Sequence, residues 1–358
     1  MQPQAISSQC LGEMRNYQTA VRIWLLIVAA FIAVMVVVGG LTRLTDSGLS
    51  ITEWQLIKGA LPPLSDEAWQ VAFAKYREIP EYKLVNDGMN LSEFKSIYWW
   101  EWGHRFLGRF IGFVFFVPFV FFWFKKALSR QLTHRLLVIF ILGGLQGALG
   151  WYMVKSGLVE RVDVSQYRLA AHLGLAVLLF GCVVWTFLRL GHKTGNSHSY
   201  HSLSLGAVVI VVMVFAQILL GALVAGLHAG RIYNTWPLMD GMWIPEGLMD
   251  KSPVFLNFFE NMLTVQFDHR IGAYLIVLVT LYQAYQVLRA GMSKQVLVST
   301  AALISVMICQ IALGIWTLLA VVPIDLAIAH QLGALCLFAV ALYHLHTLKQ
   351  PQNNLVSS

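Results

Sequence analysis

The chain has 358 residues, of which 58% are hydrophobic and only 12% are charged. A soluble globular domain carries about 25% charged residues, so this composition excludes an ordinary soluble enzyme and indicates an integral membrane protein. The net charge of +7 follows from basic loops on one side of a membrane, and it gives no reason to invoke nucleic acid.

Eight charge-free apolar runs divide the chain, and each is close to the ~20 residues that a helix needs to cross the hydrocarbon layer. Backbone polar groups must be paired within the segment in lipid, so runs of this length are expected to be helices. The sequence therefore predicts an all-α integral membrane fold with eight transmembrane helices, near residues 23–42, 110–124, 136–154, 169–188, 203–227, 271–288, 295–319 and 326–348.

The loops between these runs differ in charge. Basic residues gather before the first span and in every second loop, whereas the first of the alternate loops is rich in Asp and Glu. The positive-inside rule then places both termini in the cytoplasm. The leader is not Arg-rich and the first run is too long for a signal peptide, so we expect a multi-pass protein of a bacterial inner (plasma) membrane. No structural disulfide is expected, since the cysteines lie in the leader or within spans: Cys10, Cys182, Cys309 and Cys336.

A duplication runs through the chain. The stretch 39–63 matches the stretch 221–245, "LQGALG" matches "CQIALG", and "HR" and "AH" pairs recur in the same order. Because each copy holds an even number of spans, we expect two tandem four-helix bundles related by a pseudo-two-fold axis along the membrane normal. The predicted segments are a cytoplasmic leader (1–21), an N-terminal repeat (22–190), a cytoplasmic linker (191–202), a C-terminal repeat (203–348) and a cytoplasmic tail (349–358).

Each predicted repeat carries one histidine at the start of its second helix and one at the start of its fourth: His104 and His172, then His269 and His330. These helices run in the same direction, so each pair can face across a bundle core toward the outer side, as the axial ligands of a haem require. One such histidine alone is usually a hydrated interfacial residue, but ionisable groups in spans tend to mark function.

Other residues near these histidines fit the same prediction. Small residues are expected to leave room for a macrocycle, and nearby arginines to pair with its propionates. Two further histidines, His344 and His346, are expected to be hydrated on the cytoplasmic side. The glycines are Gly108, Gly112, Gly174 and Gly272, and the arginines are Arg105, Arg109 and Arg270.

One carboxylate breaks the symmetry of the duplication, because Glu53 in the first outer loop aligns with Thr235 in the second. A carboxylate beside a porphyrin edge can stabilise positive charge, accept a proton and orient water. It can also be a headgroup-level or helix-capping residue, since Ser50 and Thr52 precede it. These residues leave three functions open: an oxidoreductase acting on haem, a dihaem b-type electron-transfer cytochrome, and a haem carrier or assembly factor.

Two aromatic-rich segments of the first outer loop also have two interpretations. The segment 65–82 is predicted to be an amphipathic helix that either caps the substrate site or rests at the headgroups. The cluster that follows it is typical of an interfacial belt, and alternatively lines a porphyrin: Tyr98, Trp99, Trp100 and Trp102.

Several motifs, in order along residues 20–347, resemble the haem A synthase family in its proteobacterial and mitochondrial branch: "GGLTRLTDSGLSITEW", "GALPP", "YWWEWGHRFLGR", "RLAAHLGLA", "NTWPLMDG" and "FDHRIGAY". The resemblance implies oxidation of the C8 methyl group of haem O to a formyl group by successive hydroxylations, which gives haem A for cytochrome oxidase. It implies water-derived oxygen and an external electron acceptor, a membrane quinone or another respiratory carrier.

The resemblance also implies roles for individual residues. His269 and His330 are the expected axial ligands of a haem b cofactor, His104 and His172 the expected ligands of the substrate haem, and Glu53 matches an essential glutamate. Haem O synthase is the expected donor of substrate, and homo-oligomers are possible. Some family members carry a cysteine pair in an outer loop; this chain does not, so a mechanism through that pair does not apply.

Overall fold

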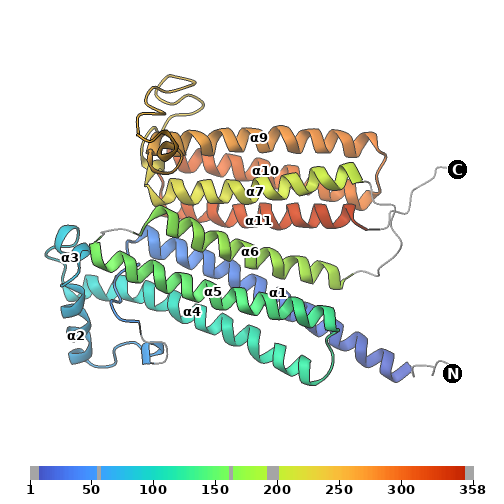
Figure 1. Ribbon diagram of the computed structural model, residues 1–358, viewed down its shortest axis with the longest axis horizontal. Coiled ribbons are helices and arrows are strands. Elements are labelled where there is room, and N and C mark those ends of the chain that lie inside the picture. The colour runs from blue at the N-terminus through green and yellow to red at the C-terminus, as the bar shows by residue number, and fades with distance from the viewer. Residues whose placement is uncertain (1–7, 55–57, 161–163, 192–200, 351–358) are drawn as a thin grey trace.

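The computed structural model describes residues 8–54, 58–160, 164–191 and 201–350, and over these residues it is helical without a strand (Figure 1). Eight of the described helices are long and apolar enough to cross a membrane, which confirms the predicted number of spans. They are α1 (Ser8–Leu44), α4 (Leu91–Phe124), α5 (Arg130–Glu160), α6 (Gln166–Leu190), α7 (His201–Gly226), α9 (Met262–Arg289), α10 (Lys294–Leu319) and α11 (Ile324–Leu348).

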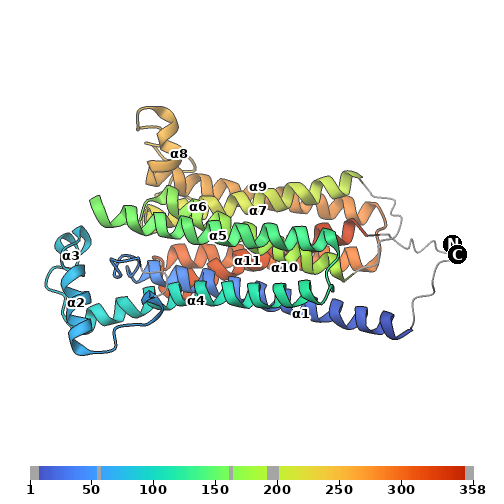
Figure 2. The ribbon, with the colours of Figure 1, turned by 60° about the horizontal axis from the view of Figure 1, so that its bottom comes forward.

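The long helices form two groups that lie side by side, α1, α4, α5 and α6 in one and α7, α9, α10 and α11 in the other (Figure 1). α6 packs against α7 and α11, and α1 packs against α11. The short helices α2 (Asp66–Tyr76), α3 (Pro80–Leu84) and α8 (Asn257–Glu260) all lie at one end of the bundle, away from the beginning of α1 (Figure 2). The expected segment boundaries stay predictions, and most of the linker and tail lies outside the described residues.

The two groups of helices are joined by polar contacts as well as by one apolar core. That core extends from Leu25 in α1 to Leu335 in α11. Gln331 donates from Nε2 to the carbonyl oxygen of Val36 at 2.9 Å, and the guanidinium of Arg43 donates to the carbonyl of Ala225. Since buried polar groups in an apolar core need partners, these bonds set the register between the halves.

Helix α4 begins at Leu91, many residues before the apolar run that predicted it. Asn90 caps it: Oδ1 of Asn90 accepts from the backbone N–H groups of Ser92 and Glu93, and the Glu93 carboxylate accepts from the N–H of Asn90 at 2.8 Å. This capping box satisfies the first donors of the helix. The expectation that His104 stands at a helix start is therefore wrong, because charged residues end the apolar run without ending the helix.

A buried polar network lies in the second group of helices, near the C-terminal ends of α9 and α11. His344 is fully buried, and its Nδ1 lies 2.9 Å from Oγ of Ser299. The amide of Gln283 donates to the carbonyl of Leu203 at 3.0 Å and lies 3.4 Å from Nε2 of His344. His346 is also buried, so the expectation that both histidines are hydrated is wrong; tertiary packing encloses the last turns of α11.

Helices α2 and α3 occupy the segment 65–82, where a single amphipathic helix was predicted, and its location on the outer surface stays a prediction. Ser65 caps α2 by accepting from the N–H of Ala68 at 3.2 Å. Trp69 packs edge-on against Tyr98, with ring centroids 4.9 Å apart, and Phe73 packs on Phe94 at 5.1 Å. The segment therefore covers the N-terminal end of α4, and Tyr98 lies beneath it rather than in an exposed belt.

The described cysteine side chains, Cys182, Cys309 and Cys336, form no disulfide.

Candidate functional site

The second group of helices brings the rings of His269 in α9 and His330 in α11 close together. Their ring centroids lie 6.5 Å apart and their planes meet at 77°. A metal–imidazole bond is about 2 Å long, so a metal between two imidazoles separates the bonding nitrogens by about 4 Å and the ring centres by somewhat more. The spacing therefore suits one metal ion with the two rings as opposite ligands.

The donor set itself favours haem over a bare ion. No group of three or more His, Cys, Asp or Glu side chains among the described residues is placed to hold a metal ion. Two axial imidazoles are sufficient when a macrocycle supplies the remaining ligands. The geometry of His269 and His330 fits that case.

Two glutamines determine which nitrogen of each ring is available. The amide nitrogen of Gln217 lies 3.1 Å from Nδ1 of His269, and that of Gln310 lies 3.1 Å from Nδ1 of His330. Within the described part of the chain no hydrogen bond engages Nε2 of either ring. Among these residues, Nε2 is therefore the nitrogen of each ring without a protein hydrogen bond, and it can bind a metal in the tautomer that carries the proton on Nδ1.

In the first group of helices the ring of His104 in α4 lies against Gly39 of α1, and the ring of His172 in α6 lies against Gly150 of α5. His172 is contacted by Gln146 of α5, whose amide donates to the His172 carbonyl at 3.0 Å and lies 3.4 Å from Nε2 of the ring. Nδ1 of His172 is buried and has no hydrogen-bond partner. The fold thus brings the His269 and His330 rings together, while the pairing of His104 with His172 stays a prediction.

Each of the four rings lies against a glycine of another helix, an arrangement that the sequence analysis missed. A methyl group on the glycine would come within 2.7–3.2 Å of a ring atom, so any larger residue would push the ring out of position. The repeated segments "QGALG" and "QIALG" were the sequence pattern that could have indicated these glycines. The pairs are Gly39 with His104, Gly150 with His172, Gly221 with His269, and Gly314 with His330.

The glycines named from the sequence have other surroundings. Gly108 faces Met35, Gly174 faces Leu219 of α7, and Gly272 faces the amide oxygen of Gln217. Gly174 therefore serves helix packing rather than space for a macrocycle. Nothing lies within 4 Å of the position that a Cβ would take at Gly112.

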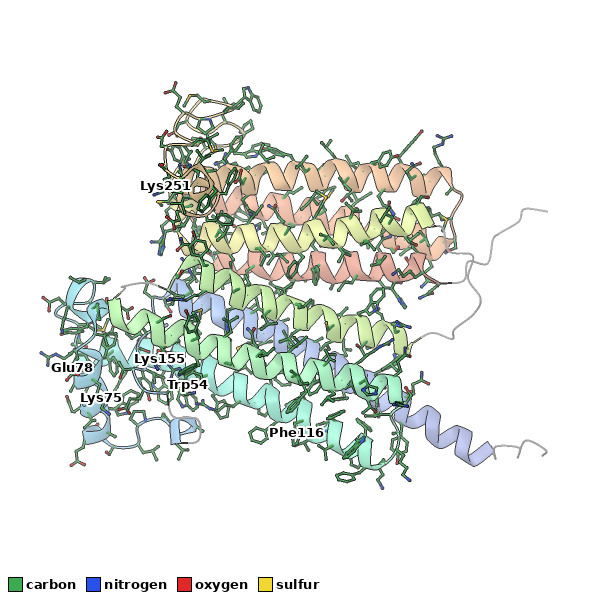
Figure 3. All side chains as sticks on the ribbon, viewed as in Figure 1. Trp54, Lys75, Glu78, Phe116, Lys155 and Lys251 are labelled. Atoms are coloured by element: carbon green, nitrogen blue, oxygen red, sulfur yellow. The ribbon has the colours of Figure 1, made fainter. Side chains whose placement is uncertain are left out.

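Glu53 lies in the loop between α1 and α2, with about half of its side chain exposed. Its Oε1 is 2.5 Å from Nζ of Lys75 in α2, and both residues line a hollow with Glu78 and Lys83. Lys75 and the neighbouring Trp54 lie at the end of the molecule that carries α2 (Figure 3). The sequence analysis did not identify Lys75, because only the tertiary fold brings α2 to this loop.

Arg105 ties this loop to the helix that carries His104. It donates to the carbonyl oxygens of Ile51 at 2.9 Å and Glu53 at 3.1 Å, and its guanidinium lies over the ring of Trp54. The backbone of Glu53 is therefore held next to the residue that follows His104.

Glu101 is a second carboxylate of this site, and its role was not predicted. It is buried, its Oε1 accepts from Arg105 at 2.5 Å, and its Oε2 accepts from Ser50 Oγ and the Ile51 N–H, both at 2.7 Å. A buried carboxylate with three charge-assisted bonds fixes the loop strongly. The available signal was the spacing of Glu101 and Arg105 by four residues on one helix face.

The second group of helices has a related arrangement, in which an uncharged glutamine takes the place of the Glu101 carboxylate. Arg270 donates to the carbonyls of Tyr233 at 2.8 Å and Thr235 at 2.9 Å, and the Gln266 amide oxygen accepts from Arg270 at 2.9 Å. Arg105 and Arg270 thus bind loop carbonyls with both terminal nitrogens, while Nε of each is buried without a partner. Their pairing with propionates stays a prediction, as does that of Arg109.

Burial also affects Tyr76, the last residue of α2. Burial and then the nearby Glu81 carboxylate raise the pKa of Tyr76 above its ordinary value. The hydroxyl therefore remains protonated at neutral pH. Its oxygen accepts a hydrogen bond from Asn86 at 2.7 Å, which stabilises the turn after α2.

Replacing Glu101 with alanine is expected to destabilise the loop between α1 and α2 by about 3–5 kcal/mol, because Arg105 would keep a buried charge without its partner. Glu101→Gln is the matched control, since Gln266 occupies the equivalent place beside Arg270, and we expect it to lose much less. Thermal unfolding in detergent and protease cleavage of residues 45–65 measure both effects. Equal stability of Glu101→Ala and the wild type would contradict this role.

Comparisons with known proteins place this architecture in a family. Residues 22–342 match the family described as "Cytochrome oxidase assembly protein". The heme A synthase of Parvibaculum lavamentivorans is 54% identical over 92% of this chain and 94% of its own length. Those of Bradyrhizobium diazoefficiens and Nitrosomonas eutropha are 51% and 48% identical, over 93% and 90% of this chain and 93% and 92% of their own lengths. The chain therefore belongs to the cytochrome oxidase assembly protein family.

Proposed function

We propose that the chain is a haem A synthase, an oxidoreductase that converts the C8 methyl group of haem O to a formyl group and so supplies haem A for cytochrome oxidase. The observation that carries the proposal is an asymmetry between similar sites. Both halves carry histidines beside an arginine-tethered loop, yet only the first loop has a carboxylate, Glu53, where the second has Thr235.

In this proposal the two pairs have different occupants. His269 and His330 bind haem b through their Nε2 atoms, and Arg270 lies beside the haem. Haem b supplies one-electron transfer when bound. His104 and His172 bind the substrate haem, with Arg105 and Arg109 toward its propionates. The 6.5 Å separation of the His269 and His330 rings and the glycines packed against all four rings support two-histidine sites in both halves.

Glu53 is the proposed catalytic residue. Converting a methyl group and one water molecule to a formyl group releases four protons and four electrons, so the site needs a proton acceptor and the membrane an electron acceptor. A carboxylate accepts protons, orients water and stabilises positive charge on the porphyrin edge. The proposed electron acceptor is a membrane quinone or another respiratory carrier. Lys75 donates to the Glu53 carboxylate and orients it.

We propose a bacterial inner membrane setting with both termini cytoplasmic and the histidines toward the outer face. The common location of α2, α3 and α8 at one end (Figure 2) agrees with this orientation. Two four-helix repeats related along the membrane normal are supported by the corresponding bonds of Arg105 and Arg270. Haem O synthase is the proposed source of substrate, and self-association within the bilayer is compatible with the fold.

Extraction of the bound haems tests the function. The protein is expressed in a host that makes haem O but no haem A, purified, and its haems are separated by chromatography. Haem b together with haem A or hydroxylated haem O is the expected result. Two equal portions of haem b would instead favour a dihaem electron-transfer cytochrome, and unchanged haem O in every preparation would favour a carrier.

A further inference from the structure

Three of the four histidines share a glutamine clamp, which we define as a glutamine four residues before the glycine that packs on the ring. The segments are "QGALG" at 146–150, "QILLG" at 217–221 and "QIALG" at 310–314. Residues four apart lie on one face of a helix, so the glycine allows the ring to approach and the glutamine holds it. The corresponding segment beside His104 is "MVVVG" at 35–39, with Met35 in place of glutamine.

The clamp contacts its histidine at two points in the second half. The amide of Gln217 donates to the His269 carbonyl at 2.7 Å and lies 3.1 Å from Nδ1 of the ring. The amide of Gln310 does the same at His330, with distances of 2.9 and 3.1 Å. The bond to the carbonyl fixes the amide, and the contact of the amide with Nδ1 restricts the rotation of the imidazole, so both rings are oriented before a metal binds.

The clamp weakens in the first half. Gln146 lies 3.4 Å from the His172 ring and reaches Nε2 rather than Nδ1. A methionine thioether has no hydrogen to donate and is a weak acceptor, and the end of the Met35 side chain is directed toward Gly108. The ring of His104 is also turned differently, since its Nε2, and not Cε1, lies closest to Gly39.

The amide oxygens support a ligand-related role. Oε1 of Gln146, Gln217 and Gln310 is buried without a hydrogen-bond partner. A buried unpaired carbonyl is costly, and a metal-bound histidine needs an acceptor for the proton on its other nitrogen. The two ends of an amide have nearly the same outline, so each glutamine can serve as that acceptor when its amide turns over, in exchange for its bond to the histidine carbonyl.

We propose that the glutamine clamp determines how firmly each site retains its haem: Gln217 and Gln310 are positioning residues that make the second site permanent, and Met35 leaves His104 unclamped so that the first site can exchange its haem. This inference rests on the proposed function, in which one haem is a resident cofactor and the other enters as substrate and leaves as product. It assigns the exchangeable bond to His104.

Reciprocal substitutions test the proposal in the full-length protein, loaded with iron protoporphyrin IX in detergent. Gln217→Met is expected to speed haem loss from the second site by about 10–100-fold. Met35→Gln is expected to slow loss from the first site by roughly tenfold, the effect of one added hydrogen bond. Transfer of haem to apomyoglobin reports the two sites as slow and fast phases. The low-spin EPR signal, which depends on the angle between the axial rings, is expected to change in Gln217→Met.

Gln283→Met is the matched control, because Gln283 is also a buried glutamine that donates to a carbonyl and approaches a histidine, but at the other end of the bundle. It removes a comparable buried amide and is expected to leave both phases and the EPR signal unchanged. The proposal is overturned if Gln217→Met behaves like this control, or if Met35→Gln leaves the fast phase unchanged.

These readouts require no turnover, so they are separate from the test of the proposed function. Two equally slow phases in the wild type would overturn the inference even if the chain made haem A. If the protein makes no haem A but shows distinct slow and fast phases that respond to the two substitutions, the proposed function is wrong and the role of the glutamine clamp is supported.

Discussion

Replacing either His269 or His330 with alanine is expected to remove the resident haem b from the purified protein. The two rings are 6.5 Å apart on opposite sides of the proposed iron position, so losing one leaves an unfilled axial position and a cavity beside Gly221 or Gly314. The remaining imidazole alone would hold haem weakly and convert it from low spin to high spin. Haem content per protein and the optical spectrum after purification measure both effects.

His134→Ala is the control for this result. His134 is an exposed histidine of α5 outside either pair, and its replacement is expected to change neither haem content nor spectrum. Full haem b with an unchanged low-spin spectrum in both the His269 and His330 variants would contradict the assignment of the cofactor site. Since each histidine also packs on a glycine, circular dichroism of the helices confirms that the variants are folded.

Glu53→Ala is expected to retain haem b but to lower the rate of haem A formation by roughly 10²–10⁴-fold, the usual contribution of a general acid or base. The side chain is half exposed and its ion pair with Lys75 lies at the surface. An exposed pair of this kind contributes little to stability, so the loss of activity would not reflect unfolding. Chromatography of the extracted haems over a time course measures the rate.

Two further variants separate a role of Glu53 in the chemistry from a role of charge in the hollow. Glu53→Gln keeps the size of the side chain but cannot accept a proton, and it is expected to be as inactive as Glu53→Ala. Glu78→Ala removes another carboxylate that lines the same hollow and is expected to be active. Normal turnover by Glu53→Gln, or equal inactivity of Glu78→Ala, would rule out the proposed role.

Much of the fold was predictable from local sequence. Eight spans followed from apolar runs, because lipid leaves the backbone no alternative to helices of that length. The facing of His269 and His330 could be predicted because equivalent histidines on parallel helices of a bundle reach the same depth. The family followed from the motifs around these residues. None of these inferences needed a contact between distant segments.

Other features depended on contacts that hydropathy does not encode. Three such features involve segments whose spacing along the chain gives no periodic signal. They are the burial of Glu101, the ion pair of Glu53 with Lys75, and the packing of Trp69 on Tyr98. The bonds of Arg105 to the carbonyls of the loop were not predicted either.

The sequence by itself determined the membrane class, the number of spans and the histidine pairs, since each depends on residue type and spacing within one helix or one repeat. Tertiary structure alone decided which glycine lies under each ring and which side chain holds it. Gln217 and Met35 occupy equivalent places in two similar sequences, yet only the packing of α7 on α9 brings the Gln217 amide to within 3.1 Å of His269. An amide between helices forms a bond only when a neighbouring helix presents a partner at the right depth and rotation, and that is set by the whole bundle.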